Sequence, residues 1–487
     1  MKKKIALMTW HHVQNYGTAF QAYALKTTIE KMGFSVDLID YKRKNESPIK
    51  KCTISSMFFN KIKAIKKKSS VSTKQYKFPK EIFDDFFDKY FTYTFPCEYN
   101  QDFYLLNKEY CGFVCGSDQI WGPEWLDERF FLDFVLDNSK KVAYAPSFGV
   151  DYIDDRSAEE IIKRRISDFK YLSLREKSGC NIAKKMTRRQ DIQHVLDPVL
   201  LLEKKEWKEM CEENVDIPAS YMLIFFLKNN EEYFNVAIKI AELLGLKPLI
   251  MHCTQSEDNI YVNIKKPPTP KEILTYIRNA SYVCTDSFHV TVLSIIFNIE
   301  FLVFKKNGCH EINAKNGRIT NLLEVLGIEN HEYDGNIEKR EMIDYEIVNK
   351  KLIELRNKST VYLKQALNDI SLKCEVNISS TYSICKKMDL GCSGELNLAY
   401  LRRKRKAIGI IDKFLLNMID CWNFSLKEEC YGCKYYIHQG LAYNIRKPLF
   451  YYELIQMLND DVPLIKIYWQ YYLTFDIKKI IKVMLGK

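Results

Sequence analysis

Short apolar runs alternate with segments of helical periodicity over much of this chain, and this alternation constrains the fold more than any other feature of the sequence. Residues 4–10 form an apolar run typical of a buried strand. A polar turn ending in Gly17 follows, then apolar residues at helical spacing over 18–32 and a second apolar run over 34–41. This order predicts a β-loop-α-β unit, from which parallel, doubly wound sheets are built.

The alternation continues along the chain and starts again near Tyr221. Helical patterns between the later apolar runs predict helices at 157–168, 177–187, 231–244, 271–279 and 288–297. Apolar runs predict further strands at 110–115, 141–145, 171–174, 194–196, 221–227, 247–252, 281–285 and 301–304.

We therefore expect an α/β protein with two doubly wound, Rossmann-like domains and a cleft between them. The first domain is expected over residues 1–205, with a basic insertion at 42–80, and the second over 206–370. Residues 203–219 are polar and acidic, which favours a linker between the domains. A helical pattern near 345–369 is predicted to close the second domain.

The chain is basic, with 73 Lys and Arg against 62 Asp and Glu, a net charge of +11. Such a balance suits anionic partners: phosphorylated metabolites, phospholipid surfaces or nucleic acid. We expect no nucleic acid, because the basic segments lack the interleaved aromatics of a nucleic-acid-binding motif. No apolar run reaches the roughly 18 residues of a membrane span, and the first apolar stretch is too short for a signal peptide. A cytoplasmic location is expected.

Residues 371–487 lack the alternation and are interpreted as a mainly helical, cysteine-containing, basic appendage. Cys430 and Cys433 form a C-x2-C pair that Cys385 and Cys392 could complete as a metal site, but the spacing is irregular. Because the chain has no second such pair, buried free thiols are the preferred interpretation, and no metal or cofactor is expected.

The appendage also holds five consecutive basic residues at 402–406, just before an amphipathic run at 408–419. This pattern is typical of a helix that lies on an anionic membrane surface. A solvated basic face on a packed helix explains the same pattern equally well. Peripheral membrane contact therefore stays one of two interpretations.

Two loops that follow predicted strands could bind a ligand. Residues 11–17 lead into a helix N-terminus, which offers free N–H groups to an anion, although a simple tight turn fits them too. Residues 116–121 follow an apolar strand, where polar groups commonly meet ligands and where a helix cap is the alternative. The candidate contacts in these loops are Asn15, Tyr16, Gly17, Ser117, Asp118 and Gln119.

A third loop places Asp286, Ser287 and His289 between a predicted strand and helix. Histidine is the side chain best suited to exchange a proton near neutral pH, although a lone histidine is more often structural. Arg175 follows the strand at 171–174, and Arg318 opens an apolar helix. Either guanidinium could bind a phosphate or carboxylate with two N–H groups.

Six segments, taken in order, resemble the polysaccharide pyruvyl transferase family. Each is a weak signal alone, but six in register over roughly residues 4–330 are specific. They are 15–25 (NYGTAFQAYAL), 114–121 (VCGSDQIW), 173–179 (SLREKSG), 195–198 (VLDP), 285–289 (TDSFH) and 318–323 (RITNLL).

The resemblance implies a two-domain fold like that of GT-B glycosyltransferases. It also implies transfer of the pyruvyl group of phosphoenolpyruvate to a pair of sugar hydroxyls, with formation of a ketal during cell-surface polysaccharide synthesis. The family's functional arginine and histidine correspond to Arg175 and His289, and Arg318 is a weaker addition. The implied partners are phosphoenolpyruvate and a saccharide acceptor, with a lipid-linked saccharide as one option.

The sequence departs from the family pattern at two positions. Val290 stands where a small glycine usually follows the histidine, and Pro146 stands where a small residue is common. Both bear on which substrate is accepted rather than on the reaction. Two other functions stay open: a GT-B-type glycosyltransferase with a nucleotide-sugar donor, and a non-catalytic saccharide-binding or scaffold protein.

Overall fold

The computed structural model describes residues 2–11, 13–42, 80–227, 230–252, 267–305, 317–337 and 340–372. Residues 2–98 and 110–372 belong to one compact unit, and residues 99–109, with helix α4 (Asn100–Glu109), are grouped in a second. The basic insertion, His12 and nearly all of the predicted appendage, with its basic cluster and cysteine pair, lie outside the described residues. The two sheets both lie in the first unit.

The first sheet has six parallel strands in the order β2-β1-β3-β4-β5-β6. On β1, Ile5 pairs with Val36 on one side and Gly112 on the other. The strand order therefore reverses between β1 and β3, which is where open α/β sheets bind ligands. The strands are β1 (Lys4–Met8), β2 (Ser35–Leu38), β3 (Gly112–Cys115), β4 (Lys141–Ala143), β5 (Tyr171–Leu174) and β6 (Gln193–His194).

Helix α1 (Tyr16–Lys31) connects β1 to β2 and is buried along most of its length. It begins where the Asn15 side chain accepts a hydrogen bond from the Thr18 backbone N–H at 3.2 Å. Gly33 follows its end with φ at +97°, a conformation that glycine adopts without strain. The other long helices of this half are α3 (Lys80–Tyr90), α5 (Arg156–Ser167) and α6 (Lys177–Thr187).

The second sheet has four parallel strands in the order β10-β9-β7-β8, so its order reverses between β7 and β9. All six residues of β7 are buried, as expected for a central strand covered on both faces. The strands are β7 (Tyr221–Phe226), β8 (Lys247–His252), β9 (Tyr282–Thr285) and β10 (Phe301–Val303). The helices are α8 (Glu231–Leu243), α9 (Pro270–Arg278), α10 (Phe288–Phe297) and α11 (Gly317–Leu326).

Part of the segment expected to be a linker forms a helix, α7 (Lys204–Met210). Trp207 on α7 is fully buried, and its ring centroid lies 5.5 Å from that of Phe20 and 5.9 Å from that of Tyr23 on α1. A buried tryptophan fixes this short helix against the first sheet's α1, which a polar linker would not do.

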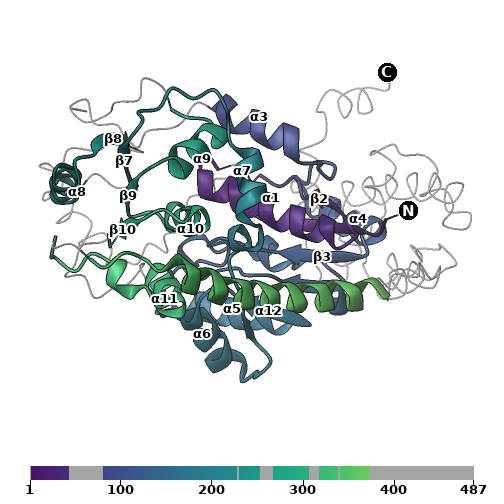
Figure 1. Cartoon of the computed structure of the whole chain (residues 1–487). Helices are drawn as coiled ribbons and strands as arrows, with labels where there is room; N and C mark the ends of the chain where they lie inside the picture. Colours follow the sequence, from purple (N-terminus) through teal and green to yellow (C-terminus); the bar gives the residue numbers. More distant parts are fainter. Residues whose placement is uncertain are drawn as a thin grey trace, which may run out of the picture. The chain divides into compact units, whose positions relative to one another are not determined.

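The helix expected to close the second domain spans both sheets instead. Helix α12 (Tyr345–Leu372) begins beside the second sheet, where the Tyr345 hydroxyl donates to the Ile299 carbonyl. It ends against the first sheet, where the Tyr362 hydroxyl donates to the Ala143 carbonyl at 3.3 Å and Ile370 is fully buried (Figure 1). Both halves thus share one long helix.

The expected fold class is confirmed: the protein is α/β, with two doubly wound, Rossmann-like sheets in tandem as in a GT-B-like fold. Along the chain, α-helices separate the consecutive strands within each sheet except β3 and β4, between which the described residues form only short 3-10 helices. Among the residues that the structure describes, no helix combines the length and apolarity needed to cross a membrane.

Candidate active site

The loops after β1 and β3 lie together at the carboxyl edge of the first sheet. The Thr18 hydroxyl donates to Asp118 Oδ2 at 2.9 Å, and the Ser117 backbone N–H donates to Gln21 Oε1 at 2.8 Å. Gly116 has φ at +131°, and a β-carbon there would lie 1.9 Å from the Tyr144 carbonyl oxygen. The N-terminus of α1 and the loop after β3 are therefore held side by side at the point where the strand order reverses.

His289 comes from the second sheet and reaches this same edge. It lies in the first turn of α10, which Ser287 caps by accepting from the Val290 backbone N–H at 3.5 Å. A β-carbon built on Gly17 would lie 2.0 Å from His289 Nδ1, so the imidazole rests against the first turn of α1. The structure thus brings together two predicted site residues from opposite halves of the fold.

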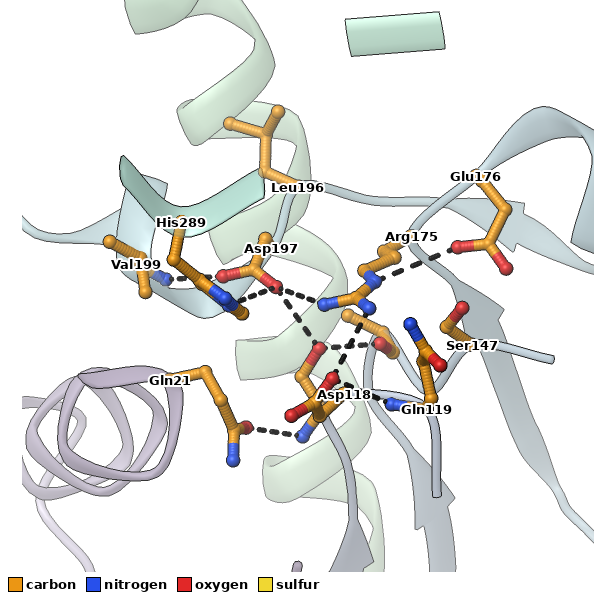
Figure 2. A network of polar contacts seen from close by, with 12 residues as sticks. Gln21, Asp118, Gln119, Ser147, Arg175, Glu176, Leu196, Asp197, Val199 and His289 are labelled. Atoms are coloured by element: carbon orange, nitrogen blue, oxygen red, sulfur yellow. Dashed lines mark hydrogen bonds and ion pairs between the residues drawn. The ribbon is translucent and has the colours of Figure 1, made fainter. Parts of the chain in front are cut away.

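Arg175 follows β5 and is enclosed by carboxylates (Figure 2). Its guanidinium is 0% exposed; Nη1 donates to Asp197 Oδ2 at 2.9 Å and Nη2 to Asp118 Oδ1 at 3.4 Å. Its Nε lies 3.7 Å from Glu176 Oε2. Burial alone would lower the pKa of Arg175, but these three carboxylates hold it above its ordinary value. Arg175 is therefore a fixed cation at the centre of the site.

Asp197 joins the two halves of the site (Figure 2). It is 1% exposed; Oδ1 accepts from the Val199 backbone N–H at 3.0 Å and Oδ2 from the Ser117 hydroxyl at 3.3 Å. Oδ2 also lies 3.7 Å from His289 Nε2. Burial would raise the pKa of Asp197, but His289, Arg175 and the Val199 N–H hold it well below its usual range. Asp197 is thus a buried anion facing the histidine.

The pKa values of the other two buried carboxyl groups are shifted in opposite directions. Burial would raise the pKa of Asp118, but Arg175, His289 and Arg318 hold it below its ordinary value. For Glu176 burial prevails: its pKa is raised, and Arg175 and Arg318 offset only part of the effect. The site therefore combines two aspartates whose pKa values are lowered with one glutamate whose pKa is raised.

Arg318, at the start of α11, has a different environment from Arg175. The Gln119 amide is assigned with its oxygen toward Arg318, because in this orientation the oxygen accepts from both terminal guanidinium nitrogens, 2.7 Å from Nη1. The guanidinium carbons of Arg318 and Arg175 lie 5.8 and 4.9 Å from the Phe288 ring centroid. Burial and the neighbouring Arg175 lower the pKa of Arg318 to about 10. Within the described part of the chain, no carboxylate forms an ion pair with it.

The remaining predicted contacts have bonds that organise the loops. Asn15 caps α1, and the Tyr16 hydroxyl donates to the Pro268 carbonyl. Asp286 Oδ1 accepts from the Leu227 backbone N–H at 2.6 Å, across the reversal point of the second sheet, and Ser287 caps α10. The structure brings the other predicted residues into one cluster: Gly17, Ser117, Asp118, Gln119, Arg175, His289 and Arg318.

Three residues of this cluster were not predicted as site residues. Asp197 and Glu176 stand inside two of the resembling segments, and Phe288 precedes the histidine. The only signal for Asp197 is its place directly after a strand, before a proline that starts a short helix. Their roles depend on partners from other strands, so local spacing did not reveal them.

No group of three or more metal-ligating side chains is placed together in the described segments. Several buried polar atoms of the cluster lack a hydrogen-bond partner among the described residues. They are Arg175 Nε, Glu176 Oε1 and Oε2, His289 Nε2 and Arg318 Nε. Unpaired buried polar atoms are costly, and their concentration in one place is typical of a functional site.

The model of one protein family, described as polysaccharide pyruvyl transferase, matches residues 15–305, more than half of the chain. The match covers all parts of the cluster except Arg318. No curated protein matches the chain.

Solved structures with similarity to the chain include three proteins at low identity. The S. aureus MnaA–UDP structure has 8% identity and a TM-score of 0.41, and covers 75% of this chain and 91% of its own. The Methanocaldococcus jannaschii UDP-GlcNAc 2-epimerase has 14% identity and a TM-score of 0.37, with 76% and 99% covered. The glycosyltransferase SnogD from Streptomyces nogalater has 8% identity and a TM-score of 0.29, with 76% and 99% covered.

Proposed function

Because the chain belongs to the polysaccharide pyruvyl transferase family, we propose that it transfers the pyruvyl group of phosphoenolpyruvate to two hydroxyls of a saccharide, forming a ketal in cell-surface polysaccharide synthesis. One observation carries the proposal. A histidine and two arginines from different strands and helices converge on one buried cluster, with nitrogens that lack partners among the described residues. Proton transfer and anion binding are what this reaction requires.

The proposed reaction has four steps. A proton adds to the methylene carbon of phosphoenolpyruvate, and a sugar hydroxyl adds to the neighbouring carbon with loss of its own proton. The bond from that carbon to the phosphate oxygen then breaks, and phosphate leaves. The second hydroxyl adds in its place and loses its proton, so that one proton ends on the methyl group and one on phosphate.

His289 is the proposed proton donor to the methylene carbon, because it is the histidine in the cluster and lies in the first turn of α10. Arg318 is the proposed contact for the donor's phosphate or carboxylate, since Gln119, a neutral group, is its hydrogen-bond partner in the cluster. Arg175, which is already paired with carboxylates, is proposed to add positive charge to the site. Gly17 leaves room for the His289 ring, and the backbone N–H groups at the α1 N-terminus are proposed to face the anionic donor.

Fewer observations support the proposed site for the saccharide acceptor. Asn15, Tyr16, Asp286 and Ser287 surround the cluster on the loops after β1 and β9 and are proposed to shape the saccharide site. A lipid-linked acceptor, a cytoplasmic location and contact with an anionic membrane rest on the sequence alone, because residues 402–419 lie outside the described residues.

An acceptor screen tests the proposal. The full chain is incubated with phosphoenolpyruvate and a panel of free, nucleotide-linked and lipid-linked saccharides, and products are read by mass spectrometry and phosphate release. The expected result is one acceptor that gains the mass of a pyruvate ketal, with matching phosphate, and no product with His289→Gln. Products that carry a sugar from a nucleotide-sugar donor instead would overturn it.

A further inference from the structure

His289 presents its two ring nitrogens to different surroundings. Nε2 faces Asp197 Oδ2 at 3.7 Å and is buried with no hydrogen-bond partner among the described residues. Nδ1 faces the backbone of Gly17, where a β-carbon would approach it to 2.0 Å. A neutral imidazole carries its proton on only one of its two nitrogens. A hydrogen-bond acceptor that faces one nitrogen favours the tautomer with the proton on that nitrogen.

Asp197 is the hydrogen-bond acceptor that faces Nε2. Its carboxylate cannot turn away freely, because it is held by the Val199 backbone N–H at 3.0 Å and by Arg175 Nη1 at 2.9 Å. The Ser117 hydroxyl donates to the same Oδ2 that faces the histidine. A fixed carboxylate oxygen accepts only, so it favours a proton on Nε2.

The charged groups around His289 come from several elements. Asp197 follows β6, Asp118 follows β3 and Arg175 follows β5, while the α1 N-terminus lies at Nδ1. Both aspartates have pKa values held below their usual range, so they stay anionic near neutral pH. A fixed negative charge therefore faces Nε2, while the positive end of α1 lies at Nδ1.

We infer that Asp197 is a positioning residue that holds His289 in the Nε2–H tautomer, so that Nδ1 is the atom that exchanges the proton with the substrate. The inference deepens the proposed function and rests on it for the substrate's identity. In the reaction the ring starts with a proton on both nitrogens; its Nδ1–H bond breaks, a C–H bond forms at the methylene carbon, and the electron pair stays on Nδ1, which leaves the Nε2–H tautomer. A sugar hydroxyl then returns a proton to Nδ1. The separation of 3.7 Å to Asp197 is expected to shorten when a donor is bound.

The test reads the tautomer directly by NMR. The full chain is labelled with ¹⁵N-histidine, and the His289 ring nitrogens are assigned by their loss in His289→Gln. At a pH where this ring is neutral, we expect the wild-type spectrum to show the Nε2–H form. Observation of the Nδ1–H form in the wild type would overturn the inference.

Variants add a second readout. Asp197→Asn is expected to shift the ring toward the Nδ1–H form, to lower kcat by about 100-fold or more with a smaller change in KM, and to displace the pH profile of kcat. The matched control is Asp127→Asn, because Asp127 also caps a short helix by accepting from a backbone N–H, that of Arg129 at 3.0 Å. Asp127→Asn is expected to leave tautomer and pH profile unchanged. An Asp197→Asn variant with wild-type tautomer and profile would contradict the assignment.

The two proposals fail separately. The tautomer is measured without substrate, so an Nε2–H ring in a protein that never consumes phosphoenolpyruvate would reject the function and keep the positioning role. An Nδ1–H ring in a protein that turns over phosphoenolpyruvate would reject the positioning role and keep the function.

Discussion

The imidazole of His289 lies against the backbone of Gly17 so closely that a β-carbon on Gly17 would sit 2.0 Å from His289 Nδ1. The two residues belong to different halves of the fold: Gly17 to the first turn of α1 beside the first sheet, and His289 to the first turn of α10 beside the second. The site exists only where these two helix N-termini meet, so a change at either one is expected to disturb it.

Gly17→Ala is expected to remove most activity while leaving the fold intact, because the added methyl group must displace the His289 ring. The control is Gly33→Ala, after the other end of the same helix, where nothing lies within 4 Å. Its φ of +97° makes that substitution cost about 1–2 kcal/mol of stability. Activity and thermal unfolding of both variants separate the effects. An active Gly17→Ala enzyme would contradict the placement of His289.

Arg318→Met is expected to weaken phosphoenolpyruvate binding by roughly 10- to 100-fold, the loss of one charge-assisted hydrogen-bonding group. It is also expected to raise the thermal unfolding midpoint by a few degrees. The pKa of Arg318 is lowered to about 10, so below that pH the folded state carries a penalised charge, which methionine removes. Calorimetric titration and thermal unfolding measure the two effects. Unchanged affinity would exclude Arg318 from donor binding.

Glu176→Gln tests the raised pKa of the Glu176 carboxyl. Because the pKa of Glu176 is raised in the folded state, its contribution to folding stability is fully present below the unfolded-state pKa of 4.5. This contribution is lost as the pH rises through the folded-state pKa. The variant is therefore expected to be more stable than wild type at neutral pH and to lose this advantage in acid. Denaturant unfolding across pH 4 to 8 measures the difference.

Glu128→Gln gives the control of opposite sign. Burial would raise the pKa of Glu128, but Arg165 and Arg164 hold it below its ordinary value. Its stabilising effect is present above the unfolded pKa and lost as pH falls through the folded pKa. Glu128→Gln is expected to be slightly less stable than wild type at neutral pH. Equal pH dependence of both variants would contradict the assignment for Glu176.

Ile370→Ala tests the attachment of α12 to the first sheet. Ile370 is fully buried there, and truncation of a buried isoleucine costs about 2–5 kcal/mol. Val361 on the same helix is 63% exposed, and Val361→Ala is expected to change stability by less than about 0.5 kcal/mol. Equal losses from the two substitutions, measured by denaturant unfolding, would show that α12 does not pack as described.

Much of the fold could be predicted because each strand and helix carries its own local pattern. Residues 4–10 and 18–32 differ in hydrophobic period, and β1 and α1 form there. Helix α7 was missed because it has seven residues, of which only Trp207 and Met210 are buried. The pattern of α12 shows an amphipathic helix but not which sheet its apolar face covers.

The site was predictable only in part, for a related reason. Gly17, Asp118 and His289 each follow a predicted strand, and parallel strands bring such loops to one edge. The pairing of Arg175 with Asp197 joins residues after different strands, which no local spacing encodes. The sequence therefore suggested that the Arg175 guanidinium could bind a ligand with two N–H groups. The structure shows that Arg175 is already paired with carboxylates, whereas Arg318 has no carboxylate partner among the described residues.

The most direct test of the central claim is calorimetric titration of the full chain with phosphoenolpyruvate and, separately, with a panel of nucleotide sugars. The account predicts saturable binding of phosphoenolpyruvate that Arg318→Met weakens, and no comparable binding of any nucleotide sugar. Saturable binding of a nucleotide sugar together with no heat from phosphoenolpyruvate would contradict it.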